Sequence, residues 1–226
     1  MLYWFQYWWL LVPAIIFGFI AQMMVRNTYT KYAKIGTQSG LSGAEMARRI
    51  LDSNNLRDVP VEEVAGRLTD HYDPRTRTLR LSRSVRQGRS VAALGIAAHE
   101  SGHAIQHSRS YVPLAIRNTV YPVASFGSRL GPLIVLGGLI FGIAGPLITI
   151  GIALFAFAVF FSILTLPVEL NASARAMRIL SSSGVMTSDE LVGARKVLNA
   201  AAMTYVASAL ASVLTLLRLV LLSRSR

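Results

Sequence analysis

"LGPLIVLGGLIFGIAGPLITIGIALFAFAVFFSILTLPV", residues 130–168, contains no charged side chain. As one helix this run would be about 58 Å long at 1.5 Å per residue, whereas a membrane core of roughly 30 Å needs only about 20 residues. The run is therefore expected to fold back on itself, and "AGP" around Gly145 and Pro146 is the natural break. We predict a transmembrane helical hairpin over residues 120–167, with its second arm over 147–166.

Two other apolar stretches are long enough to cross a membrane. Residues 2–24, "LYWFQYWWLLVPAIIFGFIAQMM", carry no charge and begin with a Trp/Tyr cluster suited to a membrane interface. They lack the basic start and small-residue cleavage site of a secretory signal, so we predict a retained transmembrane anchor. Residues 200–222 are predicted to form a last transmembrane helix. An amphipathic or core helix is the alternative there, because Arg218 lies near the end of the apolar stretch.

Composition favours a membrane protein, since 53% of the residues are hydrophobic. The chain has no cysteine, which excludes disulfides and thiolate metal sites. The net charge of +12 is spread along the chain without a nucleic-acid motif, so no nucleic-acid partner is expected.

Basic residues that flank transmembrane helices orient membrane proteins, because such segments stay on the cytoplasmic side. Most Lys and Arg lie in residues 25–112, which predicts a cytoplasmic location for that region. Four crossings would then place the basic C-terminal "SRSR" outside the cytoplasm. Either the last helix does not span the membrane, or the preference of basic residues for the cytoplasmic side is weak there.

Residues 25–112 form the long polar stretch of the chain. Ser42 stands three residues before Glu45, a capping-box pattern that predicts a short amphipathic helix. "TLRLS", residues 78–82, alternates as a strand does and follows the turn signal Asp73-Pro74, which predicts a small hairpin or edge strand. Ser90 is a suitable cap for a helix that continues to His107.

That helix contains "AAHESGHAIQH", residues 97–107, with three of the four histidines. His99 and His103 are four residues apart and therefore lie on one helix face, where two imidazoles can bind one ion. With Glu100 they form the H-E-x-x-H pattern, in which zinc lowers the pKa of a water and the Glu accepts its proton. A structural histidine pair, satisfied by backbone or water, is the alternative.

A third zinc ligand has to come from another part of the chain. His107 continues the spacing but lies about 12 Å along the helix axis from His99, beyond the reach of the same ion. The metzincin pattern is excluded, because it requires a glycine and a histidine where this chain has Gln106 and Arg109.

Carboxylates after the histidine helix are few, namely Glu169, Asp189 and Glu190. Glu169 ends the uncharged run in "LPVELNASARAMRIL", where Ala172 and Ser173 are small enough to pack closely on the histidine helix. An unpaired carboxylate beside an apolar layer is costly, and metal coordination would neutralise it. Glu169 is thus the candidate third ligand, with a salt bridge to Arg175 or Arg178 as the alternative.

With these residues in place, the chain resembles the YugP-type neutral zinc metallopeptidases of bacterial membranes. The resemblance covers nearly the whole chain through the anchor, "GLSGAEMARRIL", "LTDHYDPRTRTLRLS", "AAHESGHAIQH" and "LPVELNASARA". The chain is also distantly similar to the HtpX-type and CAAX prenyl endopeptidases. The resemblance implies a mainly α, multi-pass membrane, zincin-like metalloprotease with a small β-hairpin.

The resemblance also implies roles for individual residues. His99, His103 and Glu169 would bind Zn²⁺, and Glu100 would be the general base. His71, Tyr72 and Asp73 would match the edge strand that holds an extended substrate, with His71 or Tyr72 as possible substrate or oxyanion contacts. The HtpX-type pattern has an Asp shortly after the ligand Glu, whereas this chain has Leu170 and Asn171 there, which leaves the partner that orients the zinc ligands unidentified.

The sequence therefore predicts a membrane-bound zinc-dependent endopeptidase of the bacterial inner membrane. Its expected substrates are proteins or peptides, and membrane proteins are one class of candidate substrate. The expected regions are an anchor (2–24), a zincin-like catalytic region (25–112), a hairpin (120–167), a helical region with the third ligand (168–199) and a last helix (200–222). A non-catalytic zinc-binding membrane scaffold or regulator is the alternative function. A small transporter is disfavoured, because residues 130–168 offer almost no polar side chain.

Overall fold

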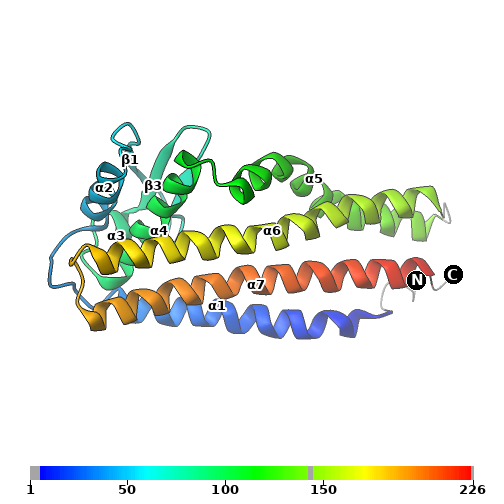
Figure 1. Ribbon diagram of the computed structural model, residues 1–226. Coiled ribbons are helices and arrows are strands. Elements are labelled where there is room, and N and C mark those ends of the chain that lie inside the picture. The colour runs from blue at the N-terminus through cyan, green and yellow to red at the C-terminus, as the bar shows by residue number, and fades with distance from the viewer. Residues whose placement is uncertain (1–5, 142–144, 225–226) are drawn as a thin grey trace. The chain divides into compact units, whose positions relative to one another are not determined.

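The computed structural model describes residues 6–141 and 145–224, and this part of the chain is mainly helical with one three-stranded sheet (Figure 1). The long helices are α1 (Val12–Tyr32), α2 (Gly43–Ser53), α4 (Val91–Ser108), α5 (Val112–Ile140), α6 (Pro146–Ser182) and α7 (Ser188–Arg224). The short elements are the 3-10 helix η2 (Trp8–Leu11), α3 (Arg83–Arg86) and the strands β1 (Val61–Val64), β2 (His71–Asp73) and β3 (Thr78–Ser82).

The chain divides into two compact units. One, here called the apolar unit, comprises Met1–Gln22, Val112–Pro167 and Met203–Arg226. The other, the polar unit, comprises Met23–Tyr111 and Val168–Ala202. The helices α1, α6 and α7 contribute residues to both units, so each of them changes character along its length.

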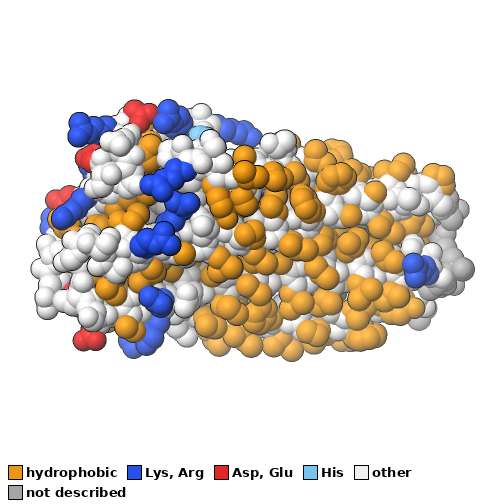
Figure 2. Space-filling view, viewed as in Figure 1, with side chains coloured by type: hydrophobic (Ala, Val, Ile, Leu, Met, Phe, Trp, Pro, Cys, Tyr) orange, Lys and Arg blue, Asp and Glu red, His pale blue; other side chains and the backbone are white. Residues whose placement is uncertain are grey.

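Among the described residues, four helical stretches are long and apolar enough to cross a membrane: Trp8–Tyr32, Val112–Ile140, Pro146–Ser182 and Ser188–Arg224. Their large hydrophobic side chains are often exposed, and Phe19, Ile140 and Ile15 are each more than 60% accessible. Figure 2 shows hydrophobic side chains over most of the visible surface of the apolar unit. Lipid tails solvate such a surface whereas water does not. The expected mainly α, multi-pass membrane fold is confirmed.

Glycines set the packing of α5 on α6 in the apolar unit. A Cβ at Gly127 would lie 2.1 Å from the Leu154 carbonyl oxygen, and one at Gly131 would lie 2.8 Å from the Gly151 carbonyl oxygen. The two backbones therefore approach more closely than any larger residue would permit. Of the predicted break "AGP", Gly145 has φ +87° and Pro146 begins α6, while the alanine before them lies outside the described residues.

Both helix caps expected in the polar unit are present. The Ser42 hydroxyl accepts a hydrogen bond from the Glu45 amide at 3.3 Å, and the Glu45 carboxylate accepts one from the Ser42 amide at 2.7 Å. The Ser90 hydroxyl accepts a hydrogen bond from the Ala93 amide at 3.2 Å at the start of α4. These bonds fix the first turns of α2 and α4.

The sheet has the order β1-β3-β2. The strands β2 and β3 form the expected antiparallel hairpin, with His71 opposite Arg80. The strand β1 was not expected and pairs with β3 in parallel, with Val61 opposite Leu79. Consequently β3 is the central strand, buried along most of its length, and β2 is an edge strand.

The core of the polar unit lies between α2, α4 and the sheet. The side chains of Met46, Ile50 and Leu51 on α2 share one face and pack with residues of β3 and α4, so α2 is amphipathic as predicted. Six large aliphatic side chains of this core are almost fully inaccessible: Met46, Ile50, Leu51, Leu79, Leu81 and Leu94. A rigid core directly under α4 holds the histidine helix in place.

Candidate metal centre

Small residues on α4 allow two other helices to reach it. A Cβ at Gly102 would lie 2.8 Å from the Ala172 carbonyl oxygen of α6, and one at Gly95 would lie 3.5 Å from the Ala194 Cβ of α7. The expectation that Ala172 permits close packing on the histidine helix is therefore confirmed. This approach brings residues of α6 next to His99 and His103.

Three side chains from α4 and α6 converge at this contact. The Nε2 atoms of His99 and His103 lie 3.2 Å and 3.4 Å from Oε2 of Glu169. All three potential ligand atoms lie within 4.8 Å of one another. The two imidazole rings meet edge to face, with centroids 4.8 Å apart.

This donor set fits a zinc ion. Two imidazoles and one carboxylate form a known catalytic zinc set that leaves one position open. Ligand atoms at about 2.0–2.1 Å from the metal and at tetrahedral angles lie roughly 3.3 Å from each other. The two nitrogen–oxygen distances match that separation. Glu169 is only 2% exposed and His103 9% exposed, so these donors are also shielded from water.

Gln106 holds the imidazole of His103. Its Oε1 lies 3.0 Å from His103 Nδ1, while its Nε2 donates to the Val168 carbonyl at 2.8 Å and to Asn171 Oδ1 at 3.0 Å. Both amide hydrogens are thus used, so Oε1 accepts a hydrogen bond from His103 Nδ1–H. In the neutral ring this leaves the lone pair of the other nitrogen, Nε2, available to a metal.

Neighbouring contacts complete this network. Asn171 Oδ1 also accepts a hydrogen bond from Arg175 Nε at 2.7 Å, which fixes the orientation of the Asn171 amide. On the other histidine, the Ser173 hydroxyl lies 3.1 Å from His99 Nδ1. Each histidine therefore has a polar partner at the nitrogen that does not face Glu169.

Glu100 is buried beside the three donors but is not one of them. It is 8% exposed, and its Oε2 accepts a hydrogen bond from the Tyr72 amide of β2 at 3.1 Å. Burial raises the pKa of Glu100 to about 7, an effect that nearby His99 opposes and Glu169 supports. A carboxyl group with such a pKa can accept and release a proton near neutral pH.

The other histidines lie outside the group of three donors. His107 Nδ1 lies 2.9 Å from the Tyr72 hydroxyl, so His107 contacts a side chain of the edge strand. Burial raises the pKa of that Tyr72 hydroxyl. His71 is exposed, and its Nδ1 lies 2.8 Å from the Thr69 carbonyl.

Sequence reasoning missed Gln106, Asn171 and Ser173 as partners of the histidines. A signal was present for Gln106, because a polar residue three positions after His103 shares its helix face. Gln106 is fully buried among small and apolar residues, where a polar side chain requires hydrogen-bond partners. The role of Asn171 depends on the contact between α4 and α6, which the sequence does not display.

A family model described as "Putative neutral zinc metallopeptidase" matches residues 7–224. The chain belongs to this family. It is also 51% identical over 213 residues to a protein of Bacillus subtilis (strain 168) named "Putative membrane protease YugP", and the match covers 94% of each chain. No solved structure matches the chain. The family's description and the donor set of His99, His103 and Glu169 together identify Zn²⁺ as the cofactor.

Proposed function

We propose that this chain is a membrane-bound endopeptidase that binds Zn²⁺ through His99, His103 and Glu169 and uses Glu100 as its general base. The observation that carries the proposal is the position of Glu100. Its carboxylate is buried next to the three donors without belonging to them. A purely structural zinc site has its ligands closed around the metal and needs no additional buried carboxylate.

Bound Zn²⁺ supplies Lewis-acid chemistry, which lowers the pKa of water and polarises the scissile carbonyl. Glu100 accepts a proton from the attacking water and then donates it to the leaving amine. Glu100 lies beside the residues that would hold the ion, where a bound cation would favour the carboxylate form required of a base. Gln106 and Ser173 keep the two imidazoles oriented throughout.

The substrate in this proposal is an extended protein or peptide segment, membrane proteins included. The strand β2 is an edge of the sheet and contacts Glu100 through the Tyr72 amide. A peptide that pairs with an edge strand gains main-chain hydrogen bonds and a fixed register. His71 and Tyr72 are the residues of β2 proposed to contact the substrate or the oxyanion.

The proposed location is the bacterial inner membrane, with the polar unit on the cytoplasmic side. Lys and Arg side chains gather over the visible surface of the polar unit (Figure 2). Positively charged segments next to transmembrane helices are retained on the cytoplasmic side.

The test compares wild type, Glu100→Gln and Glu169→Ala in detergent, with zinc content and cleavage of a broad protein and peptide panel as readouts. Wild type is expected to bind one zinc and cleave. Glu100→Gln should keep zinc and lose at least about a hundredfold in cleavage rate, the usual size of general-base effects. Glu169→Ala should lose zinc. Gln87→Ala, on the exposed end of α3, is the control and should resemble wild type.

The competing function is a non-catalytic zinc-binding scaffold or regulator. It predicts zinc in the wild type, no cleavage of any substrate, and equal behaviour of wild type and Glu100→Gln. That result would replace the peptidase proposal. Loss of zinc from Glu169→Ala would then still support the metal site.

A further inference from the structure

Three arginines line one cavity of the polar unit. It has a volume of about 110 Å³, well above the ~10–15 Å³ that one water requires. Arg109 at the C-terminal end of α4 and Arg175 and Arg178 of α6 line it. The remaining lining residues are Asn54, Ile105 and Ile179.

Within the described part of the chain, no ion pair joins a carboxylate to any of the three arginines. All eleven Asp and Glu residues lie within the described ranges 6–141 and 145–224, and none forms an ion pair with Arg109, Arg175 or Arg178. Five other arginines of this unit, namely Arg48, Arg77, Arg80, Arg86 and Arg89, each pair with a carboxylate. What sets Arg109, Arg175 and Arg178 apart is that all three line one cavity. Like charges that share one hollow without a counterion repel each other, and a bound anion removes that cost.

We propose that this hollow, the arginine cavity, binds a phosphate group, which comes either from an anionic phospholipid headgroup or from a soluble phosphate. A guanidinium offers several N–H donors in a planar fork that matches phosphate oxygens. Arg109 and Arg178 are exposed, so their forks are accessible from solvent. Arg175 uses Nε for Asn171, which leaves its two terminal nitrogens for the ligand.

The position of two of the arginines in the sequence favours a membrane-associated anion. Arg175 and Arg178 follow shortly after Pro167, where the apolar part of α6 ends. Basic residues at this position attract the anionic lipids of a membrane surface. Phosphate binding can be tested independently of peptidase activity, because none of the three arginines is among the metal donors His99, His103 and Glu169.

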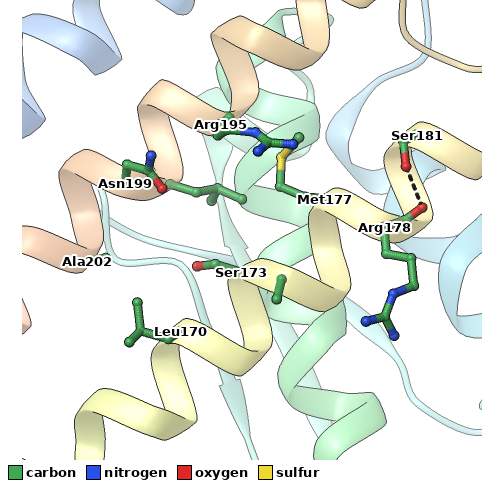
Figure 3. A pocket seen from close by; sticks show the side chains of 10 residues that line it. Leu170, Ser173, Met177, Arg178, Ser181, Arg195, Asn199 and Ala202 are labelled. Atoms are coloured by element: carbon green, nitrogen blue, oxygen red, sulfur yellow. Dashed lines mark hydrogen bonds between the residues drawn. The ribbon is translucent and has the colours of Figure 1, made fainter.

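A larger cavity between α6 and α7 borders the arginine cavity, and Arg178 lines both of them. The larger cavity has a volume of about 420 Å³, and Ser173, Met177, Arg195 and Asn199 are among its lining residues. In Figure 3 the guanidinium of Arg178 points away from the Arg195 side chain. Arg195 is exposed and does not line the arginine cavity, so it provides a matched control.

The experiment uses the full chain purified in phosphate-free detergent buffer. Binding of inorganic phosphate is measured by calorimetry, and binding to vesicles is measured with phosphatidylglycerol and with phosphatidylcholine alone. The test variant is Arg109→Gln/Arg178→Gln, which leaves the Arg175–Asn171 hydrogen bond in place. The control variant is Arg49→Gln/Arg195→Gln, which removes the same charge from positions outside the cavity.

The test variant is expected to lose about tenfold or more in affinity, because two of the three guanidinium groups that would donate hydrogen bonds to the phosphate are removed. The control should bind as wild type does. Binding of phosphate alone would identify a soluble phosphate as sufficient, whereas binding only to phosphatidylglycerol vesicles would identify a lipid headgroup. Equal affinities of the wild type, test and control proteins for both probes would overturn the proposal.

A second measurement uses the wild-type protein alone. An arginine-specific dicarbonyl reagent modifies exposed guanidinium groups, and the modified peptides are identified by mass spectrometry. Phosphate or phosphatidylglycerol should protect Arg109 and Arg178 but not Arg195. Equal modification of all three arginines with and without both anions would contradict the arginine cavity even if the double variant failed to fold.

Discussion

The amide of Gln106 determines which nitrogen of His103 carries the proton. Both Gln106 N–H groups are bound, to the Val168 carbonyl and to Asn171, so only its oxygen faces the ring. A histidine oriented in this way loses little rotational freedom when it binds a metal. Partners of this kind contribute to metal affinity although they never touch the ion.

We therefore predict that Gln106→Leu weakens zinc binding by about 10–100-fold, the usual effect of losing such a partner. Zinc affinity is measured by competition with a chelator. Gln106→Glu keeps an oxygen for His103 Nδ1–H and should recover part of the loss. Gln87→Leu is the control, and an unchanged affinity of Gln106→Leu would show that the hydrogen bond does not orient the ligand.

At the residue scale, the sequence predicts a member of the metal centre best where residue spacing alone brings two side chains together. His99 and His103 follow from their separation by four residues on a helix. Glu169 could be proposed because it is a carboxylate at the end of a long apolar run. No such local pattern joins Ser173 to His99, because that contact arises from the packing of α6 on α4.

Among the elements, the β2–β3 hairpin depends on Asp73. Its carboxylate accepts hydrogen bonds from the Arg75 amide at 2.9 Å, the Thr76 hydroxyl at 2.9 Å and Arg80 at 3.0 Å. The Arg75 amide is the main cause that lowers the pKa of Asp73 to about 2, from an ordinary value of 3.8. The ionised carboxylate thus closes the turn and pairs with the central strand.

The sign of the pH dependence follows from this lowered pKa. The folded protein binds fewer protons at Asp73 than the unfolded chain does between about pH 2 and pH 4, so stability rises with pH there. We predict that Asp73→Asn is less stable than wild type at neutral pH and that the difference disappears as the pH falls toward 2. Thermal unfolding across this range provides the measurement. Asp58→Asn, in an exposed ion pair, should show little difference, and the same small effect in Asp73→Asn would contradict the prediction.

The contact between α4 and α6 depends on Gly102. The Cβ of an alanine would meet the rigid backbone of Ala172 at 2.8 Å, so the helices would have to separate. We predict that Gly102→Ala lowers the free energy of unfolding by ~1–3 kcal/mol and also weakens zinc binding. Gly137→Ala is the control, because nothing lies within 4 Å of its Cβ position. Unchanged zinc affinity in Gly102→Ala would mean that this contact does not set the geometry of the metal centre.

Elements with strong local signals were predictable, and those that depend on pairing were not. The capping residues Ser42 and Ser90 mark the starts of α2 and α4 directly in the sequence. The strand β1 contains Glu62 and Glu63 and has no alternating apolar pattern, so its sequence does not indicate a strand. Because β1 pairs with β3 in parallel, β3 lies between two strands and is mostly buried. The prediction for residues 78–82 left open an edge strand, and that position belongs to β2 instead.

For the molecule as a whole, the orientation in the membrane can be tested with single introduced cysteines, because the natural chain has none. Ser53→Cys places one exposed thiol on the polar unit, and Phe141→Cys places one next to the break between α5 and α6. We predict that a membrane-impermeant maleimide labels Phe141→Cys in intact cells but labels Ser53→Cys only after lysis. The reverse pattern would place the polar unit outside the cytoplasm. Wild type, without thiols, is the blank.

The order of the donors along the chain has a consequence for biosynthesis. His99 and His103 precede α5 and the apolar part of α6, whereas Glu169 follows them. A ribosome therefore completes both histidines before it has made the membrane hairpin, and completes the carboxylate only afterwards. A nascent chain that is still being inserted holds two of the three donors, so the metal centre cannot be assembled until the hairpin has been synthesised.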